Sequence, residues 1–188
     1  MNDTIAPRQA PPSTTPPWIA EYPPGVPAQV QIDPDMTLVD LLEAALRQYA
    51  KRDACVCMGE RLTFAELDSL SQNLGAWLQQ LGLERGARVA LMMPNLPQYS
   101  VAIAAVLRAG CVVVNVNPLY TPRELEHQLV DSGADAIVVL ENFAHTVQEV
   151  VARSPLHATV TTEIGDLFPP AAADRLRPEE LEHQRCAV

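Results

Sequence analysis

A short segment, Asn-Pro-Leu-Tyr-Thr-Pro-Arg-Glu at residues 117–124, combines an aromatic ring with a compact helix start. The Thr121 hydroxyl can accept a hydrogen bond from the backbone N–H of Glu124, and the Glu124 carboxylate can reach back to the Thr121 N–H. Pro122 would occupy the first helical position, where its missing donor costs nothing. The segment follows an apolar run, and ligands of open α/β sheets bind beyond the carboxyl ends of such strands. Two interpretations stay open: a helix cap alone, or a cap that also borders a ligand.

The four cysteines lack the spacing of a zinc site. Cys55 and Cys57 are two residues apart in an apolar run, so in a strand they face the same side, and we interpret them as buried thiols. A zinc site needs two or more residues between paired cysteines and a second pair elsewhere. We therefore predict no metal ligands, reduced thiols and a cytoplasmic compartment.

The remaining ionisable residues do not form a catalytic set. The single lysine, Lys51, follows the first predicted helix and is interpreted as a solvated charge. No histidine has a neighbouring nucleophile or a metal-ligand partner at a useful spacing. The histidines are His127, His145, His157 and His183. We predict that this chain carries no catalytic residue.

Composition narrows the class of partner. The chain has 188 residues, is 48% hydrophobic and has a net charge of -10. Nucleic-acid binding needs clustered positive charge, so an acidic chain with scattered arginines argues against it. The longest uninterrupted apolar run, 101–107, is too short to span a bilayer, and the N-terminus lacks the apolar region of a secretory signal. At most we expect peripheral contact with the inner membrane.

Alternating helical and strand-like segments position these residues. Residues 1–35 hold nine of the 17 prolines and are predicted to form an extended arm. Residues 36–165 begin with two amphipathic helices around a β-hairpin, whose predicted turn is Gly59-Glu60. Continuous apolar runs then alternate with helices, which indicates βαβ units. The predicted strands are 87–93, 111–116, 135–141 and 157–163, and the predicted helices are 97–110, 121–133 and 142–154. The fold class is α/β, a partial doubly wound parallel sheet flanked by helices. Residues 166–188 read as an irregular or weakly helical tail.

Several joined motifs within residues 18–165 resemble a known family. They are "LTFAELD", "GARVALMMPN", a helix ending in "RAG", and "NPLYTPRELEHQLVDSGA". Together they resemble the N-terminal portion of AMP-forming acyl-CoA synthetases, and among these bacterial long-chain fatty acid–CoA ligases. The resemblance implies a two-step reaction: a fatty acid and ATP give an acyl-adenylate with Mg²⁺ assistance, and CoA then takes the acyl group.

The resemblance also implies where this chain would contribute. The segment matching "PLYTP" borders the CoA nucleotide in related ligases, which makes Pro118, Leu119 and Tyr120 candidates for CoA contact, with adenine against the Tyr120 ring. The phosphate loop and the lysine domain of the family have no counterpart here, and we expect the resemblance to end near Phe168. We therefore expect the chain to be inactive alone and to bind no cofactor by itself, whereas ATP, Mg²⁺ and CoA belong to the full-length family. A truncated gene or a shifted reading frame would explain such an ending.

An alternative is an interaction module that docks on the remaining part of a ligase, or on a second copy as a homo-oligomer, through an exposed apolar face. An ordinary flavodoxin-like or Rossmann-like binding module is disfavoured, because the glycine fingerprint that holds phosphates is absent.

Overall fold

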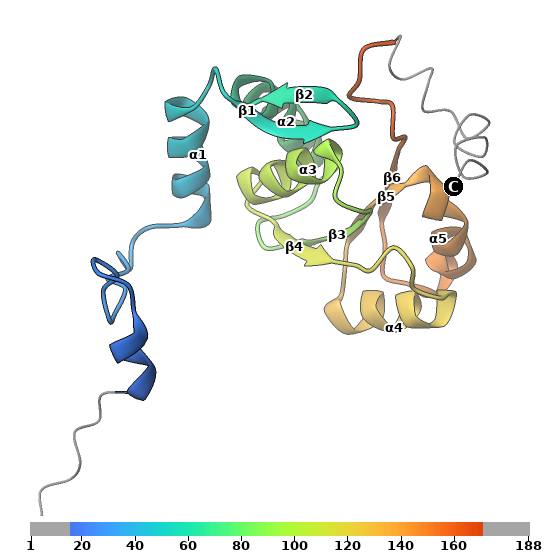
Figure 1. Ribbon diagram of the computed structural model, residues 1–188. Helices are drawn as coiled ribbons and strands as arrows, with labels where there is room; N and C mark the ends of the chain where they lie inside the picture. Colours follow the sequence, from blue (N-terminus) through green and yellow to red (C-terminus); the bar gives the residue numbers. More distant parts are fainter. Residues whose placement is uncertain (1–15, 171–188) are drawn as a thin grey trace, which may run out of the picture. The chain divides into compact units, whose positions relative to one another are not determined.

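Four strands form one parallel sheet in the computed structural model of the protein, which describes residues 16–170 (Figure 1). The strands are β3 (Arg88–Met92), β4 (Val112–Asn115), β5 (Ala136–Leu140) and β6 (Ala158–Thr162), in the spatial order β4-β3-β5-β6. All neighbouring strands in this sheet run parallel. The predicted parallel sheet is confirmed, with each predicted strand in place.

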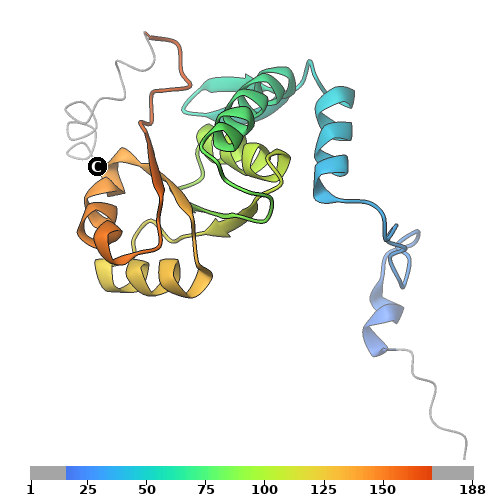
Figure 2. The same ribbon diagram turned by 180° about the vertical axis from the view of Figure 1, so that it is seen from behind.

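Alternate residues of the central strands enter two separate cores. Val89 and Leu91 of β3 pack against α2 (Phe64–Gln80) and α3 (Pro97–Arg108) on one face. Ala90 and Met92 pack on the other face, against α4 (Pro122–Ser132) and α5 (Ala144–Val150). Figure 2 shows the two helix layers from behind, on either side of the sheet. Successive residues of a central strand face opposite sides, and both sides are covered by helices. Apolar side chains are therefore needed on both sides, which explains the continuous apolar sequence.

Helices α2 and α3 approach closely at Gly75. A Cβ atom on Gly75 would lie 3.1 Å from the carbonyl oxygen of Ala105. Only glycine lets the two helices come this near without displacement, because the nearest atoms belong to the backbone.

The hairpin differs from its prediction at the turn. Strands β1 (Asp53–Cys57) and β2 (Glu60–Thr63) pair antiparallel, with Cys57 opposite Glu60, so the turn residues are Met58 and Gly59 and not Gly59-Glu60. Both turn residues have positive φ, 52° and 85°, as a type I′ turn requires. The hairpin lies against a third core, which contains Leu62, Leu67 and Val101 together with Leu46 of α1 (Leu38–Gln48).

Two predicted helices differ from their predictions, one in the coverage of its apolar face and one in its continuity. Leu46 of α1 is buried, but Leu38 and Leu41 are 67% and 58% exposed. The predicted helix 142–154 consists of three short pieces: η2 (Glu141–Phe143), α5, and η3 (Val151–Arg153).

The chain divides into two compact units, Met1–Met36 and Thr37–Val188. Within the described part of the first unit, residues 16–36, a 3-10 helix η1 (Pro17–Glu21) interrupts the extended arm that we predicted, and Trp18 is exposed. The predicted weak helix from residue 178 falls outside the described residues.

Candidate functional site

The loops that follow β3, β4 and β5 lie at the carboxyl edge of the sheet. Strands β3 and β5 are neighbours, and their connections leave in opposite directions, to β4 and to β6. This reversal is the topological switch point at which open α/β sheets bind ligands. The loop that carries Pro118, Leu119 and Tyr120 follows β4 at this edge.

The three predicted site residues lie together in one tight turn but differ in exposure. The N–H of Tyr120 donates to the Asn117 carbonyl at 3.1 Å, and the N–H of Leu119 donates to the Asn117 side chain at 3.0 Å. Leu119, at the tip, is 79% exposed. Tyr120 and Pro118 are half-buried, and the Tyr120 ring packs against the core beneath α4 and α5. Leu119 therefore presents most of the free surface of this turn, while Tyr120 covers the core.

The predicted capping box at α4 is present. The Thr121 hydroxyl accepts from the Glu124 N–H at 3.4 Å, and the Glu124 carboxylate accepts from the Thr121 N–H at 2.9 Å. The hydrogen bond from the Thr121 backbone, followed by that from its side chain, lowers the pKa of Glu124. The amino end of α4 thus already holds a carboxylate, which repels a second anion such as a phosphate.

Asn115, the last residue of β4, fixes this loop to two helices, a role that the sequence analysis missed. Its side-chain oxygen accepts from the Tyr99 hydroxyl of α3 at 2.7 Å. Its carbonyl accepts from the side-chain amide of Gln128 in α4 at 2.9 Å. The partners are 16 and 13 residues away in the sequence, so no local pattern pointed to them.

Two glutamine side chains near the loops leave a buried oxygen without a partner among residues 16–170. Gln98 in the first turn of α3 donates to the carbonyl of Glu163 at 2.7 Å, but its Oε1 has no donor. The Oε1 of Gln128 is likewise unpaired. Each amide is used through its nitrogen to hold two segments together, and its oxygen stays available to a donor.

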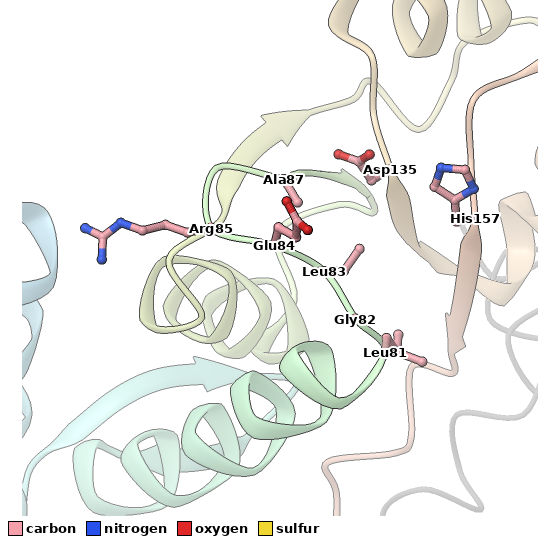
Figure 3. A pocket seen from close by; sticks show the side chains of 8 residues that line it. All are labelled: Leu81, Gly82, Leu83, Glu84, Arg85, Ala87, Asp135 and His157. Carbon is pink, nitrogen blue, oxygen red and sulfur yellow. The ribbon is translucent and has the colours of Figure 1, made fainter.

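A further cavity lies at the opposite, amino edge of the sheet. It measures about 420 Å³, and its polar lining includes Glu84, Arg85, Asp135 and His157. Figure 3 shows the Arg85 side chain directed away from the other three. The Asp135 carboxylate accepts from the Arg88 N–H at 2.8 Å and so joins the starts of β5 and β3. This carboxylate therefore has a structural partner.

The remaining predictions concern metal ligands, the exposure of ionisable side chains, and membrane-spanning helices. Within residues 16–170, no three His, Cys, Asp or Glu side chains are grouped so that they could hold a metal ion. Cys55 and Cys57 were predicted to be buried, but both are only half-buried. His127, His145 and His157 are exposed, and so is Lys51. Over the same residues, every helix is too short or too polar to cross a bilayer.

Comparison with known sequences supplies the family. The profile of the family described as "AMP-binding enzyme" matches residues 42–185. The match continues past Phe168, so the prediction that the resemblance ends there is wrong. The chain is 54% identical over 150 residues to the long-chain-fatty-acid–CoA ligase of Salmonella typhimurium, and 35% identical over 153 residues to that of Bacillus subtilis. These alignments cover 79% and 81% of this chain but 27% of each relative.

Comparison with solved structures supports the fold. The crystal structure of a long-chain-fatty-acid-CoA ligase from Archaeoglobus fulgidus matches with a TM-score of 0.66 and 24% identity. The match covers 70% of this chain and 28% of that structure. It shows that an α/β arrangement of this kind occurs within a larger ligase.

Proposed function

The chain belongs to the family of AMP-binding enzymes, and from this premise we propose that it supplies the N-terminal α/β subdomain of a long-chain fatty acid–CoA ligase. The observation that carries the proposal is the 54% identity over 150 residues with a ligase of that description. The chain spans 27% of that relative, so the activity proposed here is that of the whole ligase.

The proposed reaction has two steps. In the first, an oxygen of the fatty acid carboxylate attacks the α-phosphorus of ATP, and pyrophosphate leaves; Mg²⁺ bound elsewhere in the whole ligase would balance the charge of the phosphates. In the second, the CoA sulfur attacks the acyl carbonyl carbon, AMP leaves, and a thioester results. Both steps develop negative charge on phosphate oxygens, which requires a cation and aligned donors.

The residues that the structure describes do not fit the triphosphate or its Mg²⁺. Residues 16–170 contain no cluster that could hold a metal ion, and the printed sequence has no glycine-rich phosphate loop. We therefore assign no phosphate step to this chain. Its proposed role is to build one wall of the site with the carboxyl-edge loops.

A contact with CoA through the β4–α4 loop is the finer part of the proposal. Leu119 offers an exposed apolar side chain, and Pro118 lies beside it in the turn. The Glu124 carboxylate at the amino end of α4 disfavours the phosphates of CoA at that point. We therefore assign this loop to an uncharged part of CoA, the adenine ring or the pantetheine arm, with Tyr120 held in place by the core.

Fragment complementation tests the proposed function. The full 188-residue chain is mixed with the Salmonella ligase from which the 150 matching residues are deleted, and palmitate, ATP, Mg²⁺ and CoA are added. Each component alone should release no AMP, and the mixture should form palmitoyl-CoA. Turnover by the 188-residue chain alone would refute the assignment of the phosphate steps to other residues. An inactive mixture whose two parts demonstrably associate would refute the ligase assignment.

The second candidate function is docking on a partner, and a specific observation favours it. Leu38 and Leu41 of α1 are more than half exposed, and Trp77 and Leu81 beside the end of α2 are each 41% exposed. Large apolar side chains that stay exposed on a folded unit are candidates for a surface that another molecule covers. We propose the remainder of a ligase as the partner, with a second copy of this chain as the competing occupant. Light scattering after size-exclusion chromatography tests for a second copy, because a dimer has twice the molar mass of the chain. A monomer that binds no hydrophobic dye would contradict both partners.

We also propose that the whole ligase works in the cytoplasm, with at most peripheral contact with the inner membrane. Cys55, Cys57 and Cys111 are free thiols, as a reducing compartment favours. Flotation of the complemented ligase with lipid vesicles tests the membrane contact.

A further inference from the structure

Two cysteine side chains lie on one face of β1 beside a cavity. Cys55 pairs with Leu62 and Cys57 with Glu60, and the register between them is regular, since the irregularity of β1 lies between Asp53 and Cys55. Successive side chains of a strand alternate, so Cys55 and Cys57 share a face while Val56 faces the other way. Cys55 and Cys57 are half-buried and, together with the intervening Val56, line a cavity of about 280 Å³ at the start of α3.

The spacing of these thiols excludes a disulfide but suits a bridging ion. Residues i and i+2 of a strand are about 6.6 Å apart, and their parallel Cβ atoms have a similar separation. A disulfide needs Cβ atoms about 3.5–4.5 Å apart, so the two sulfurs cannot bond without movement of the backbone. Two metal–sulfur bonds of about 2.3 Å place the sulfurs about 4.6 Å apart, a gap that the two side chains close by leaning together.

Apart from the two thiols, the lining of the cavity offers no strong metal ligand. None of the residues that line it is charged or a histidine. Its hydroxyl from Ser100 accepts a weak hydrogen bond from the Cys55 thiol at 3.4 Å. The Tyr99 hydroxyl is already committed to Asn115. An ion held here would therefore have two thiolates as its strong ligands.

Ligand number and charge select the kind of ion. Zinc and other divalent ions take four or more ligands, and residues 16–170 provide no group of three His, Cys, Asp or Glu side chains. Copper(I) is soft, prefers thiolate and is monovalent. A copper(I) ion with two thiolates carries one negative charge, and α3 begins at Pro97 beside the cavity with no side-chain cap on its positive end.

Against the expectation from the sequence that the chain holds no metal ligand, we propose that Cys55 and Cys57 form a two-thiolate binding site for a soft monovalent metal ion such as copper(I). One ion binds both sulfurs, and the two thiol protons pass to solvent. No electron is transferred, and the site does not depend on the proposed ligase function.

An anaerobic titration tests the site. The reduced full-length chain competes with bicinchoninate for copper(I), and four single variants are compared: Cys55→Ser, Cys57→Ser, Cys111→Ser and Cys186→Ser. We expect one tightly bound ion per chain, unchanged in the last two variants. Loss of either proposed ligand should weaken binding by at least about 100-fold, the upper end of what changes around a metal's ligands cost. Unchanged binding in Cys55→Ser or Cys57→Ser overturns the proposal, as does loss of binding in Cys111→Ser.

Two further measurements guard against a folding artefact. Circular dichroism and urea midpoints without copper establish that the serine variants are folded. X-ray absorption at the copper edge of the unsubstituted chain should show two sulfur neighbours at a single distance. Three or four sulfur neighbours, or nitrogen and oxygen neighbours in their place, would overturn the two-thiolate site without reference to any variant. If zinc competed equally with copper(I) for the site, the proposed preference for a soft monovalent ion would be wrong.

Discussion

Arg108 of α3 donates from Nε to the carboxylate of Glu43 in α1 at 2.8 Å, across 65 positions of the sequence. The same guanidinium, with a side chain only 8% exposed, donates to the Ser71 hydroxyl of α2 at 2.6 Å and to the Asp68 carboxylate. A single planar group thereby joins three helices through charge-assisted hydrogen bonds.

We predict that Arg108→Ala lowers the free energy of unfolding by at least about 2 kcal/mol, since one hydrogen bond to a charged group is worth about 1.5–3 kcal/mol and the substitution removes several. The matched control is Arg47→Ala. Arg47 also pairs with Glu43, at 3.5 Å, but its side chain is 72% exposed, so its loss should cost less than about 0.5 kcal/mol. Urea unfolding measures both, and equal costs would show that the buried network adds no stability.

Acid should weaken the same network. The hydrogen bond from Arg108 lowers the pKa of Asp68 below its ordinary value of 3.8. Folding lowers the pKa of this carboxyl, so its negative charge stabilises the folded state. The contribution is complete above the pKa in the unfolded state and is lost as the pH falls through the lower pKa of the folded state. Stability should therefore be steady from neutrality to about pH 5 and fall below about pH 4. Asp68→Asn should be less stable at pH 7 with a shallower decline in acid, and an unchanged decline would contradict this origin.

The capping box of α4 permits a sharper substitution test. Thr121→Val removes the hydroxyl that accepts from the Glu124 N–H, at a cost of about 1 kcal/mol. Thr121→Ser keeps the hydroxyl and should change little. Hydrogen exchange of the first turn of α4 measures the local effect. If Thr121→Val and Thr121→Ser exchange alike, the hydroxyl is not the stabilising group.

The close approach of α2 and α3 reverses the usual preference for alanine. Gly75→Ala should destabilise by about 1–3 kcal/mol, because the new methyl group meets the Ala105 carbonyl and forces a shift of backbone. At the neighbouring exposed position, Ala76→Gly should also destabilise, by about 1 kcal/mol, through helix propensity alone. Thermal unfolding measures the stability of both variants. If Gly75→Ala were stabilised, helices α2 and α3 could move apart without cost.

The loop after β4 offers a test of the CoA contact in the complemented ligase. Leu119→Asp should raise the KM for CoA by about tenfold, the effect of losing about 1.4 kcal/mol of binding energy, and leave pyrophosphate release unchanged. Leu119→Met, which retains an apolar side chain, is the control. A fall in pyrophosphate release equal to the loss of thioester formation would place Leu119 outside the CoA contact.

Local patterns predicted the elements of this fold, and contacts distant in sequence explain what they missed. Thr121, Pro122 and Glu124 lie within one turn, so their spacing alone indicated the cap. The apolar runs of β3 and β5 indicated strands covered on both faces. The network of Arg108 joins residues 37 to 65 positions away, which no window of sequence reveals. The prediction that the hairpin turn is Gly59-Glu60 is wrong by one residue, because Met58 adopts a positive φ that methionine seldom takes and that its sequence does not indicate.

The candidate site shows the same division. The order of apolar and helical segments placed Pro118, Leu119 and Tyr120 at the end of a strand. Their unequal exposure depends on the core beneath α4 and α5, which packs Tyr120 and leaves Leu119 outside. The link from Tyr99 to Asn115 likewise needs the folded sheet, because it joins α3 to the end of β4.

The strand order β4-β3-β5-β6 bears on how the chain is assembled during synthesis. Strand β3 can pair with β4 once Asn115 has left the ribosome, but the opposite side of β3 pairs with β5, which is translated later. A nascent chain therefore exposes an unpaired, strongly apolar strand edge while α4 is being made, and such an edge invites association with other chains. Slow emergence of residues 122–135 from the ribosome should increase misassembly, whereas a pause once Leu140 has emerged should do no harm.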